Sequence, residues 1–260
     1  MTACSNPKVQ RGLFSATLPP QVEELARTFL KDPIRVLVGA KNAATETIEQ
    51  KLHFVGREDG KLLALKQMIE TGSLPLPCLV FVQSKDRANE LYRELEFDKI
   101  NVDVITAERP QPQRDRIVQE VREGKIWVLI STDLMARGMD FKGISCVINF
   151  DFPTSINQYI HRIGRTGRAG LRGTAITFFT EDDKESLRTI ANVVKQSGGD
   201  VPDWMLALPK LSKNSKKRLE KRPISRRRIG PKAGVGRKYP KRKRGEGDSE
   251  TSSKKRRSDI

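Results

Sequence analysis

Between residues 47 and 199, the apolar positions of the chain follow two spacings in turn. Short runs rich in β-branched residues alternate with longer stretches in which apolar residues recur every three or four positions. The short runs predict buried β-strands, and the longer stretches predict amphipathic α-helices. Because strands that alternate with helices are typical of a parallel sheet with helices on its faces, the pattern predicts an α/β fold.

The same pattern locates the individual elements. We predict strands over 50–55, 78–82, 102–106, 126–132, 146–150 and 174–179, and helices over 60–71, 85–96, 112–123, 155–162 and 183–196. In the last helix, Leu187, Ile190, Val193 and Val194 form the apolar stripe that is expected to face the core. These elements define one domain over residues 47–209.

Residues 1–40 do not belong to this repeat. Residues 13–17 have the composition of a strand end, and a helix over 20–29 and a short strand over 35–38 are predicted to follow. These elements look like the end of an earlier domain. We therefore interpret residues 1–40 as its remnant and residues 41–46 as a linker.

The net charge of +17 is concentrated at one end of the chain. Residues 210–260 contain 21 Lys or Arg and 5 Asp or Glu, a net charge of +16, which leaves +1 for residues 1–209. The basic segment is poor in large apolar residues and is interrupted by prolines, so it cannot bury enough surface to offset its chain entropy. We predict a disordered basic tail over 210–260.

Two compact basic clusters, 241–244 and 254–257, lie within this tail. Such clusters are typical of nuclear import signals and of contacts with nucleic acid. We expect the tail to bind a polyanion and the protein to be nuclear. The simpler alternative is a tail that only keeps the protein soluble.

The sequence gives no sign of membrane insertion, secretion or metal binding. No stretch approaches the roughly 20 apolar residues of a membrane span, and the N-terminus lacks a secretory signal pattern. Cys4, Cys78 and Cys146 form no CxxC pair, and only His53 and His161 are available beside them. We expect a soluble protein of a reducing compartment with neither disulfides nor a metal site.

Polar residues follow three of the predicted strands at their carboxyl ends. Gln83 and Ser84 follow one strand, Thr132 and Asp133 follow another, and the helix after a third strand ends in an arginine-rich run. Parallel sheets of this class bind ligands beyond that edge. The three polar ends together therefore predict a binding site.

The arginine-rich run is residues 158–168, with the sequence QYIHRIGRTGR. Each guanidinium is a permanently charged planar fork that matches phosphate oxygens, and Gly164 and Gly167 allow the backbone to turn tightly. The run predicts a phosphate-binding site. Its alternative is a solvated basic loop.

Several short motifs occur in a fixed order: Ser15-Ala16-Thr17, Phe81 to Ser84, Gln111 with Arg114, Thr132-Asp133 leading to Ala136 to Asp140, and His161 to Arg168. Their order and spacing resemble the C-terminal half of a DEAD-box RNA helicase over about residues 10 to 205. A finer resemblance, at 45–56, 80–85 and 175–184, points to the subgroup that acts on precursors of the small ribosomal subunit. That subgroup implies pre-ribosomal RNA as a partner and the nucleolus as a location.

The resemblance implies an enzyme of two RecA-like domains that close together on ATP, Mg²⁺ and RNA, of which most of this chain is the second. The nucleotide would be bound mainly by the N-terminal RecA-like domain. Arg165 and Arg168 would be arginine fingers at its γ-phosphate, where such a group can be worth about 10³ to 10⁵ in rate. His161 would bridge the domains, and Gly138 and Asp140 would lie beside the nucleotide.

Two further sets of residues take roles from the resemblance. Ser15 and Thr17 would couple the two domains. Five residues would lie along the RNA backbone, where contacts to phosphate and 2′-hydroxyl groups give affinity without reading sequence: Ser84, Gln111, Arg114, Thr132 and Asp133. In place of the His-Gly that usually precedes the Gln and Arg pair, this chain has Thr106-Ala107, which puts RNA contact by that loop in question.

Structural interpretations of the same residues stay open. Ser15 and Thr17 can cap the helix that follows them, and Thr132 and Asp133 can cap the next helix in turn. Arg114 can pair with a neighbouring acid. His53 is expected to have only a structural place in the first strand of the domain.

The chain contains neither GxxxxGK followed by Ser or Thr nor an Asp-Glu-Ala-Asp sequence, which the ATPase chemistry of the family requires. Residues 56–62, GREDGKL, imitate the first motif but are one residue short, and we interpret them as a turn before a helix. The leading hypothesis is the C-terminal half of an ATP-dependent RNA helicase, inactive alone. The alternatives are a non-catalytic module that binds RNA or a partner and, less well matched, a nuclease or translocase of a related family.

Overall fold

The structure is a computed structural model that describes residues 9–15, 17, 20–36, 47–136, 141, 143–168 and 170–230. All of the described residues belong to one unit at the level of backbone contacts. The predicted basic clusters at 241–244 and 254–257 lie outside the described residues.

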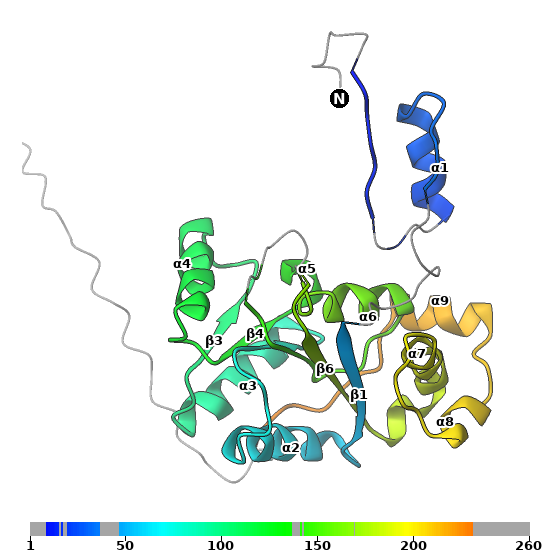
Figure 1. The fold of residues 1–260 in the computed structure, drawn as a ribbon. Helices are drawn as coiled ribbons and strands as arrows, with labels where there is room; N and C mark the ends of the chain where they lie inside the picture. Colours follow the sequence, from blue (N-terminus) through cyan, green and yellow to red (C-terminus); the bar gives the residue numbers. More distant parts are fainter. Residues whose placement is uncertain are drawn as a thin grey trace, which may run out of the picture. The chain divides into compact units, whose positions relative to one another are not determined.

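A parallel sheet of six strands forms the centre of the domain (Figure 1). The strands are β1 (Ile48–Phe54), β2 (Cys78–Phe81), β3 (Val102–Ile105), β4 (Val128–Ser131), β5 (Cys146–Asn149) and β6 (Gly173–Phe179). Their spatial order is β1-β6-β5-β2-β4-β3, and every neighbouring pair is parallel. The carboxyl ends of β5, β2 and β4 are therefore adjacent at one edge of the sheet.

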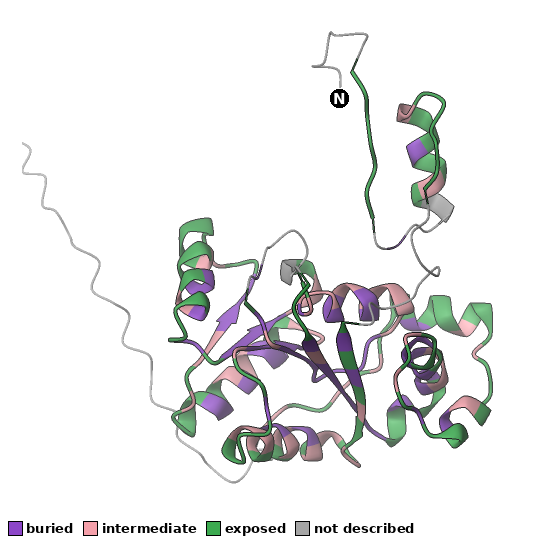
Figure 2. Cartoon of the chain, viewed as in Figure 1, coloured by how far each residue is buried: buried purple, intermediate pink, exposed green. Residues whose placement is uncertain are grey.

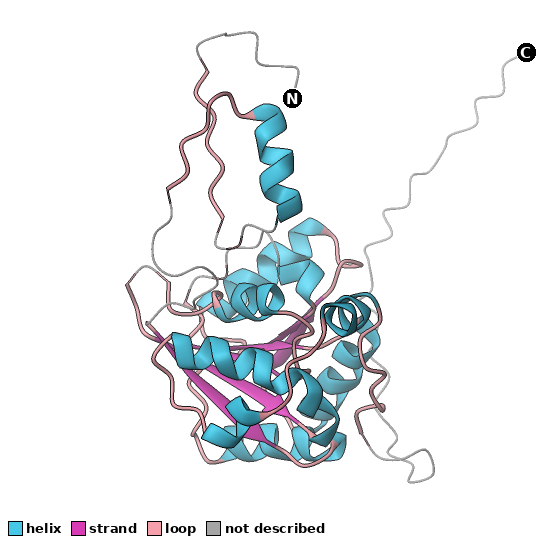
Figure 3. Ribbon diagram, turned by 90° about the vertical axis from the view of Figure 1, so that its right-hand side faces the viewer, coloured by secondary structure: helices cyan, strands magenta, loops and turns pink. Residues whose placement is uncertain are grey.

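Helices cover both faces of this sheet (Figure 3). They are α2 (Glu58–Glu70), α3 (Lys85–Phe97), α4 (Gln111–Arg122), α5 (Asp133–Ala136), α6 (Ile156–Ile163), α7 (Lys184–Gln196), α8 (Asp203–Ala207) and α9 (Lys213–Lys221), with a 3₁₀ turn η1 (Glu181–Asp183) before α7. The apolar faces of α2 and α3 pack on one side of the sheet. Those of α4, α6 and α7 pack on the other.

The four central strands are buried on both faces, as the colours of Figure 2 show. Every residue of β2, β4 and β5 is buried. Burial of both faces explains why these strands appear in the sequence as continuous apolar runs rather than as alternating patterns. It also explains why the continuous apolar runs predicted the positions of these strands accurately.

All of the strands and helices predicted over residues 47–199 are present, and most of their bounds lie within two residues of the prediction. The start of β4 shows why bounds differ. The backbone N–H groups of Trp127 and Val128 both donate to the carbonyl of Asn101, at 2.8 and 3.1 Å, so the ladder with β3 begins only at Val128. Ile126 is buried like a strand residue without being part of the ladder.

The helix predicted in the N-terminal segment is confirmed as α1 (Pro20–Phe29). The two strands predicted beside it are not formed at any residue that the structure describes in 13–17 and 35–38. A strand exists only when a neighbouring strand accepts its backbone hydrogen bonds, and the described sheet pairs no strand with these segments. Residues 16, 37, 38 and the predicted linker 41–46 lie outside the described residues.

The predicted boundary of the tail at residue 210 is wrong, because the chain is folded through Gly230. Ser212 caps α9 by accepting a hydrogen bond from the backbone N–H of Ser215 at 3.1 Å, and Leu219 of this helix is buried. Beyond α9, residues 222–230 run without regular secondary structure along α3, and their Arg226 is buried among acidic side chains. Composition misjudged this segment because the charge of its buried Arg226 is neutralised by acidic residues distant in the sequence.

None of the described helices is both long and apolar enough to cross a membrane. Cys78 and Cys146 are register partners on neighbouring strands, and both are buried free thiols. Burial raises the pKa of the Cys146 thiol to about 12, so this group stays protonated at neutral pH.

Candidate functional site

The three polar strand ends are neighbours in space, as the sheet order requires. Gln83 and Ser84 follow β2, Thr132 and Asp133 follow β4, and α6 follows β5. The prediction that these groups share one edge of the sheet is confirmed for the polar residues after β2 and β4. It is wrong for the end of the arginine-rich run, because α6 runs back across the sheet and Thr166 donates to the carbonyls of Ile144 and Ser145, which precede β5. The chemistry of the edge depends on which of its side chains point outward and which are already paired.

Local sequence accounts for the position of α6. Ser155 caps its first turn by accepting a hydrogen bond from the backbone N–H of Gln158 at 3.2 Å, and Tyr159, Ile160 and Ile163 bury its inner face. Gly167 follows at a φ of +66°, where a Cβ atom would lie 2.6 Å from Cγ1 of Ile48. Only glycine fits there, so the end of the arginine-rich run is held close to β1.

The predicted arginine fingers lie beyond the end of α6. Arg165 is half-buried and its Nε donates to the carbonyl of His161 at 3.2 Å, whereas Arg168 is exposed and its Nε donates to the carbonyl of Gly164 at 2.8 Å. In both, a bond to a backbone carbonyl helps to orient the planar guanidinium group. This is an arrangement that can present a cation to a phosphate.

Arg162 of the same run points into the domain, which corrects the view of all three arginines as phosphate ligands. Its side chain is 2% exposed, and it donates to both carboxylate oxygens of Asp133 at 2.6 and 2.8 Å. It also donates to the carbonyl of Asp151 at 2.7 Å and lies over the ring of Phe81. Arg162 is thus a structural link between β2, α5 and α6.

The position of Asp133 disfavours its predicted contact with RNA. Besides the two bonds from Arg162, its Oδ2 accepts a hydrogen bond from the side-chain amide of Gln158 at 2.6 Å. A carboxylate with both oxygens bonded inside the protein would also repel a phosphate. Asp133 is therefore better placed to orient Arg162 than to bind an RNA backbone.

Ser84 lies at the first turn of α3 and is half-buried. Its Oγ accepts a hydrogen bond from the backbone N–H of Arg87 at 3.3 Å, which makes it the N-cap of the helix. Because a hydroxyl both accepts and donates, this cap leaves the hydrogen of Ser84 to donate to an oxygen of a ligand. Thr132, at the neighbouring strand end, is also half-buried.

Gln111 and Arg114 lie on the first turn of α4. Gln111 is exposed and donates to Asp115 at 2.7 Å, and Arg114 is half-buried, with an Nε that is buried and has no hydrogen-bond partner. No ion pair is described for Arg114, so the interpretation that it pairs with a neighbouring acid gains no support in the part of the chain the structure describes.

Ser15 and Thr17 form a local turn. Ser15 Oγ donates to the carbonyl of Thr17 at 2.5 Å and accepts from its backbone N–H at 3.2 Å. The hydroxyl of Thr17 is 2.9 Å from Nε2 of His161. These bonds do not cap α1, and they bring together two residues for which the sequence predicted roles between domains.

The predicted nucleotide residues Gly138 and Asp140 lie outside the described residues. Among the residues the structure does describe, no group of three or more His, Cys, Asp or Glu side chains could hold a metal ion. His53 lies in β1 and packs its ring against Phe178.

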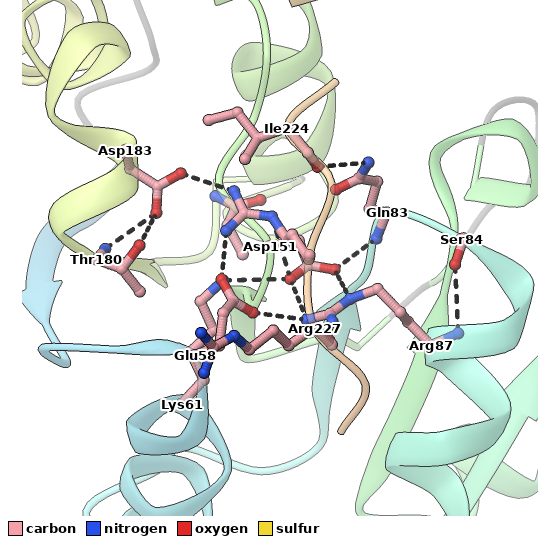
Figure 4. Close-up of polar contacts among 12 residues, drawn as sticks. Glu58, Lys61, Gln83, Ser84, Arg87, Asp151, Thr180, Asp183, Ile224 and Arg227 are labelled. Atoms are coloured by element: carbon pink, nitrogen blue, oxygen red, sulfur yellow. Dashed lines mark hydrogen bonds and ion pairs between the residues drawn. The ribbon is translucent and has the colours of Figure 1, made fainter. Parts of the chain in front are cut away.

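A buried cluster of charged residues, which no sequence pattern indicated, lies at the carboxyl edge of the sheet (Figure 4). We call it the charge cluster. It consists of three acids and three bases: Glu58, Asp151, Asp183, Lys61, Arg87 and Arg226. Each member is polar in the sequence and far from most of the others, so no local pattern connects them.

Asp151, directly after β5, is the centre of the charge cluster and is 1% exposed. Its carboxylate accepts two bonds from Arg87 at 2.7 Å, one from Lys61 at 3.3 Å and one from the backbone N–H of Gln83 at 2.8 Å. Burial alone would raise the pKa of Asp151. The bond from Arg87 and the charges of Lys61, Arg87 and Arg226 outweigh burial and lower that pKa to about 2.

The interpretation of residues 56–62 as a turn before a helix is confirmed. Gly56 has a φ of +69°, and α2 begins at Glu58. Lys61, which would be the phosphate lysine of a nucleotide loop, is 0% exposed and bound to Glu58 at 2.7 Å. It is therefore committed to the charge cluster.

Comparison with known proteins supports this fold. Residues 60–170 match the family model described as "Helicase conserved C-terminal domain". A relative from Mus musculus, named "Probable ATP-dependent RNA helicase DDX52", is 56% identical over 227 residues, which are 87% of this chain and 38% of the relative. The chain thus spans well under half the length of that relative.

Two solved structures are similar. The E. coli DEAD-box protein SrmB bound to regulator of ribonuclease activity A has a TM-score of 0.53 and 32% identity, covering 64% of this chain and 96% of that chain. A variant of S. cerevisiae Dbp5 bound to RNA and ADP BeF3 has a TM-score of 0.62 and 28% identity, covering 80% of this chain and 52% of that chain.

A parallel sheet with this strand order, the arginine-rich end of α6 and the matched model define the C-terminal, RecA-like domain of a helicase. With 96% of the SrmB chain covered at 32% identity, the family follows. The chain belongs to the DEAD-box proteins.

Proposed function

We propose that this chain is the C-terminal half of an ATP-dependent RNA helicase and supplies arginine fingers to a nucleotide bound mainly by the first RecA-like domain. The observation that carries the proposal is the division within the arginine-rich run. Arg162 is bonded to carboxylate and carbonyl oxygens inside the domain, whereas Arg165 and Arg168 lie beyond α6, where the Nε of each donates to a backbone carbonyl. The contact of His161 with Thr17 adds a polar link to the N-terminal segment.

In this proposal, ATP with Mg²⁺ would supply the phosphoryl group and its charge compensation, and arginines of this chain would act on the phosphoryl group. Arg165 and Arg168 stabilise the charge that develops on the transferred phosphoryl group. Gly138 and Asp140 are proposed to lie beside the nucleotide. The relatives support ATP use by their names, since the mouse protein is named an ATP-dependent RNA helicase.

For RNA, we propose backbone contacts by Ser84, Gln111, Arg114 and Thr132, with Asp133 holding Arg162 in place behind them. A hydroxyl donor and a guanidinium are suited to phosphate oxygens and do not select a base. The structure of the Dbp5 variant contains RNA, which supports an RNA face in this fold. By its resemblance, the substrate is pre-ribosomal RNA and the location is the nucleolus.

The second candidate function is a module that binds RNA without turnover. It is favoured by the ordered basic segment 210–230, which has ten Lys or Arg and one Glu. This function would need no first domain.

ATP hydrolysis separates the two functions. The experiment compares the chain alone with the chain fused to the first RecA-like domain of a DEAD-box relative, here called the joined protein, each with and without single-stranded RNA. We expect no turnover by the chain alone and RNA-stimulated turnover by the joined protein. Turnover by the chain alone would overturn the proposal, and RNA binding by the joined protein without turnover would favour the binding module.

A further inference from the structure

Residues 222–230, here called the strap, are anchored to the domain by one buried arginine. Arg226 donates to Glu58 at 2.6 Å and to Asp183 at 2.7 Å, and its Nε lies 3.6 Å from Asp151. Its side chain is 3% exposed. Glu58 begins α2, Asp151 follows β5 and Asp183 precedes α7. This one side chain therefore joins three parts of the domain to the strap.

The charge count of the cluster depends on the strap. Without Arg226, the buried edge would hold the three carboxylates of Glu58, Asp151 and Asp183 against only the two cations of Lys61 and Arg87. A buried charge without a partner is strongly unfavourable. Arg226 makes the cluster three against three, which explains how so basic a segment can fold onto the domain.

The strap also contacts the loop that carries a predicted RNA ligand (Figure 4). The carbonyl of Ile224 accepts a hydrogen bond from the side-chain amide of Gln83 at 3.1 Å, and the carbonyl of Arg227 accepts one from Arg87. Gln83 and Arg87 lie on either side of Ser84. The strap therefore holds both flanks of the loop between β2 and α3.

Further contacts fix the strap along its length. The backbone N–H of Ile229 donates to Glu90 of α3 at 3.0 Å, and the Ile229 side chain packs against the core on that face. Pro223, Ile224 and Arg226 line a cavity of about 140 Å³ together with Gln83 and Asp133. The strap is thus one wall of the polar edge rather than a distant attachment.

We propose that the strap is part of the RNA site, with Arg226 as a positioning residue that anchors it and thereby fixes Ser84 in the geometry that binds RNA. The proposal rests on the proposed function for the contact between Ser84 and RNA. It assigns to a segment outside the matched helicase model a role in RNA affinity that does not require the strap to touch RNA.

The test compares Arg226→Ala with Arg228→Ala, a matched control in the same strap whose side chain is 95% exposed. In the chain itself, hydrogen exchange is measured at the amides of residues 83–87 and 224–229. We expect Arg226→Ala to speed exchange at both segments by about tenfold or more, because local opening no longer breaks the buried ion pairs, and Arg228→Ala to leave it unchanged. Unchanged protection of 224–229 in Arg226→Ala would show that this residue is not the anchor.

In the joined protein, the RNA concentration at half-maximal ATPase rate is measured beside kcat. For Arg226→Ala we expect a rise of about tenfold in that concentration with kcat within about twofold of wild type, the split expected for lost binding rather than lost chemistry. Arg228→Ala should change neither. Loosening of 83–87 without any change in the RNA dependence would overturn the positioning role.

A charge-balanced variant separates positioning from folding. Arg226→Ala with Asp183→Asn leaves two acids and two bases in the cluster, and the Asn side-chain oxygen can still accept the bonds from Thr180 that Asp183 accepts. We expect this double variant to regain stability while its RNA half-saturation stays raised. Recovery of RNA affinity as well would mean that charge balance, and not the strap, sets Ser84. If wild-type joined protein shows no RNA-stimulated turnover, the proposed function fails while the exchange arm still decides whether Arg226 anchors the strap.

Discussion

Two sets of arginines in this domain differ in the groups that bind them. Arg87, Arg162 and Arg226 are buried and bonded to carboxylates of the domain. Arg165 and Arg168 lie beyond α6, with backbone carbonyls as their described partners. A guanidinium bonded to buried carboxylates organises the domain, whereas Arg165 and Arg168 are the arginines that we propose to act on a ligand.

Arg162→Ala should have the largest effect on stability. It leaves Asp133 without its bidentate partner and removes a donor to the buried carbonyl of Asp151, which by analogy with other broken buried pairs costs about 3–5 kcal/mol. Chemical denaturation monitored by circular dichroism would measure the loss. Arg162→Lys should not restore the lost stability, because an ammonium cannot reproduce the bidentate geometry. A loss below 1 kcal/mol for Arg162→Ala would show that Arg162 is not a structural residue and would group it with Arg165 and Arg168.

Gly167→Ala should cause the second-largest loss of stability. The new Cβ would lie 2.6 Å from Cγ1 of Ile48, and the φ of +66° is unfavourable for alanine. Together these effects should cost on the order of 2–3 kcal/mol. Gly170→Ala is a matched control, since Gly170 also has a positive φ but has open space around its Cβ position. Equal losses in the two variants would show that close packing on β1 is not what Gly167 provides.

Acid should lower the stability that the buried arginines and their carboxylate partners provide. The pKa of Asp151 is about 2 in the folded chain against an ordinary 3.8, so its ionised form adds stability above about pH 4 that disappears as the pH falls towards 2. The contribution is on the order of 2 kcal/mol. Unfolding free energies measured from pH 6 to pH 2 should fall less steeply for Asp151→Asn than for wild type. Parallel profiles would contradict this.

Arg168→Ala should have the smallest effect on stability, within about 0.5 kcal/mol, because its side chain is exposed and its described bond is to a carbonyl. The same denaturation measurement as for Arg162→Ala gives the comparison within one motif. A loss comparable to that of Arg162→Ala would remove the distinction between the two sets.

The α/β fold could be predicted because central strands such as β2 and β5 are buried on both faces, and burial selects continuous apolar runs. The neighbouring polar strand ends followed from the parallel arrangement. Arg162 could have been separated from Arg165 by helix phase, since it lies three residues after the buried Tyr159 and one before the buried Ile163. Its partner Asp133 could not have been identified, because nothing local connects the two residues.

The strap could not be predicted from composition. Arg226 is buried only because Glu58, Asp151 and Asp183 meet at one point of the fold, and these acids are spread over more than a hundred residues of sequence. A basic, proline-containing segment is ordinarily solvated, and its order here depends on tertiary charge compensation. Counting charges therefore placed the end of the folded domain too early.

The most direct test of the division between the two sets is kcat for ATP hydrolysis by the joined protein carrying Arg165→Ala, at saturating RNA. If Arg165 acts on the γ-phosphate, kcat should fall by about 10³-fold or more, while RNA half-saturation and the free energy of unfolding stay at their wild-type values. A kcat within about threefold of wild type would contradict the assignment of Arg165 as an arginine finger.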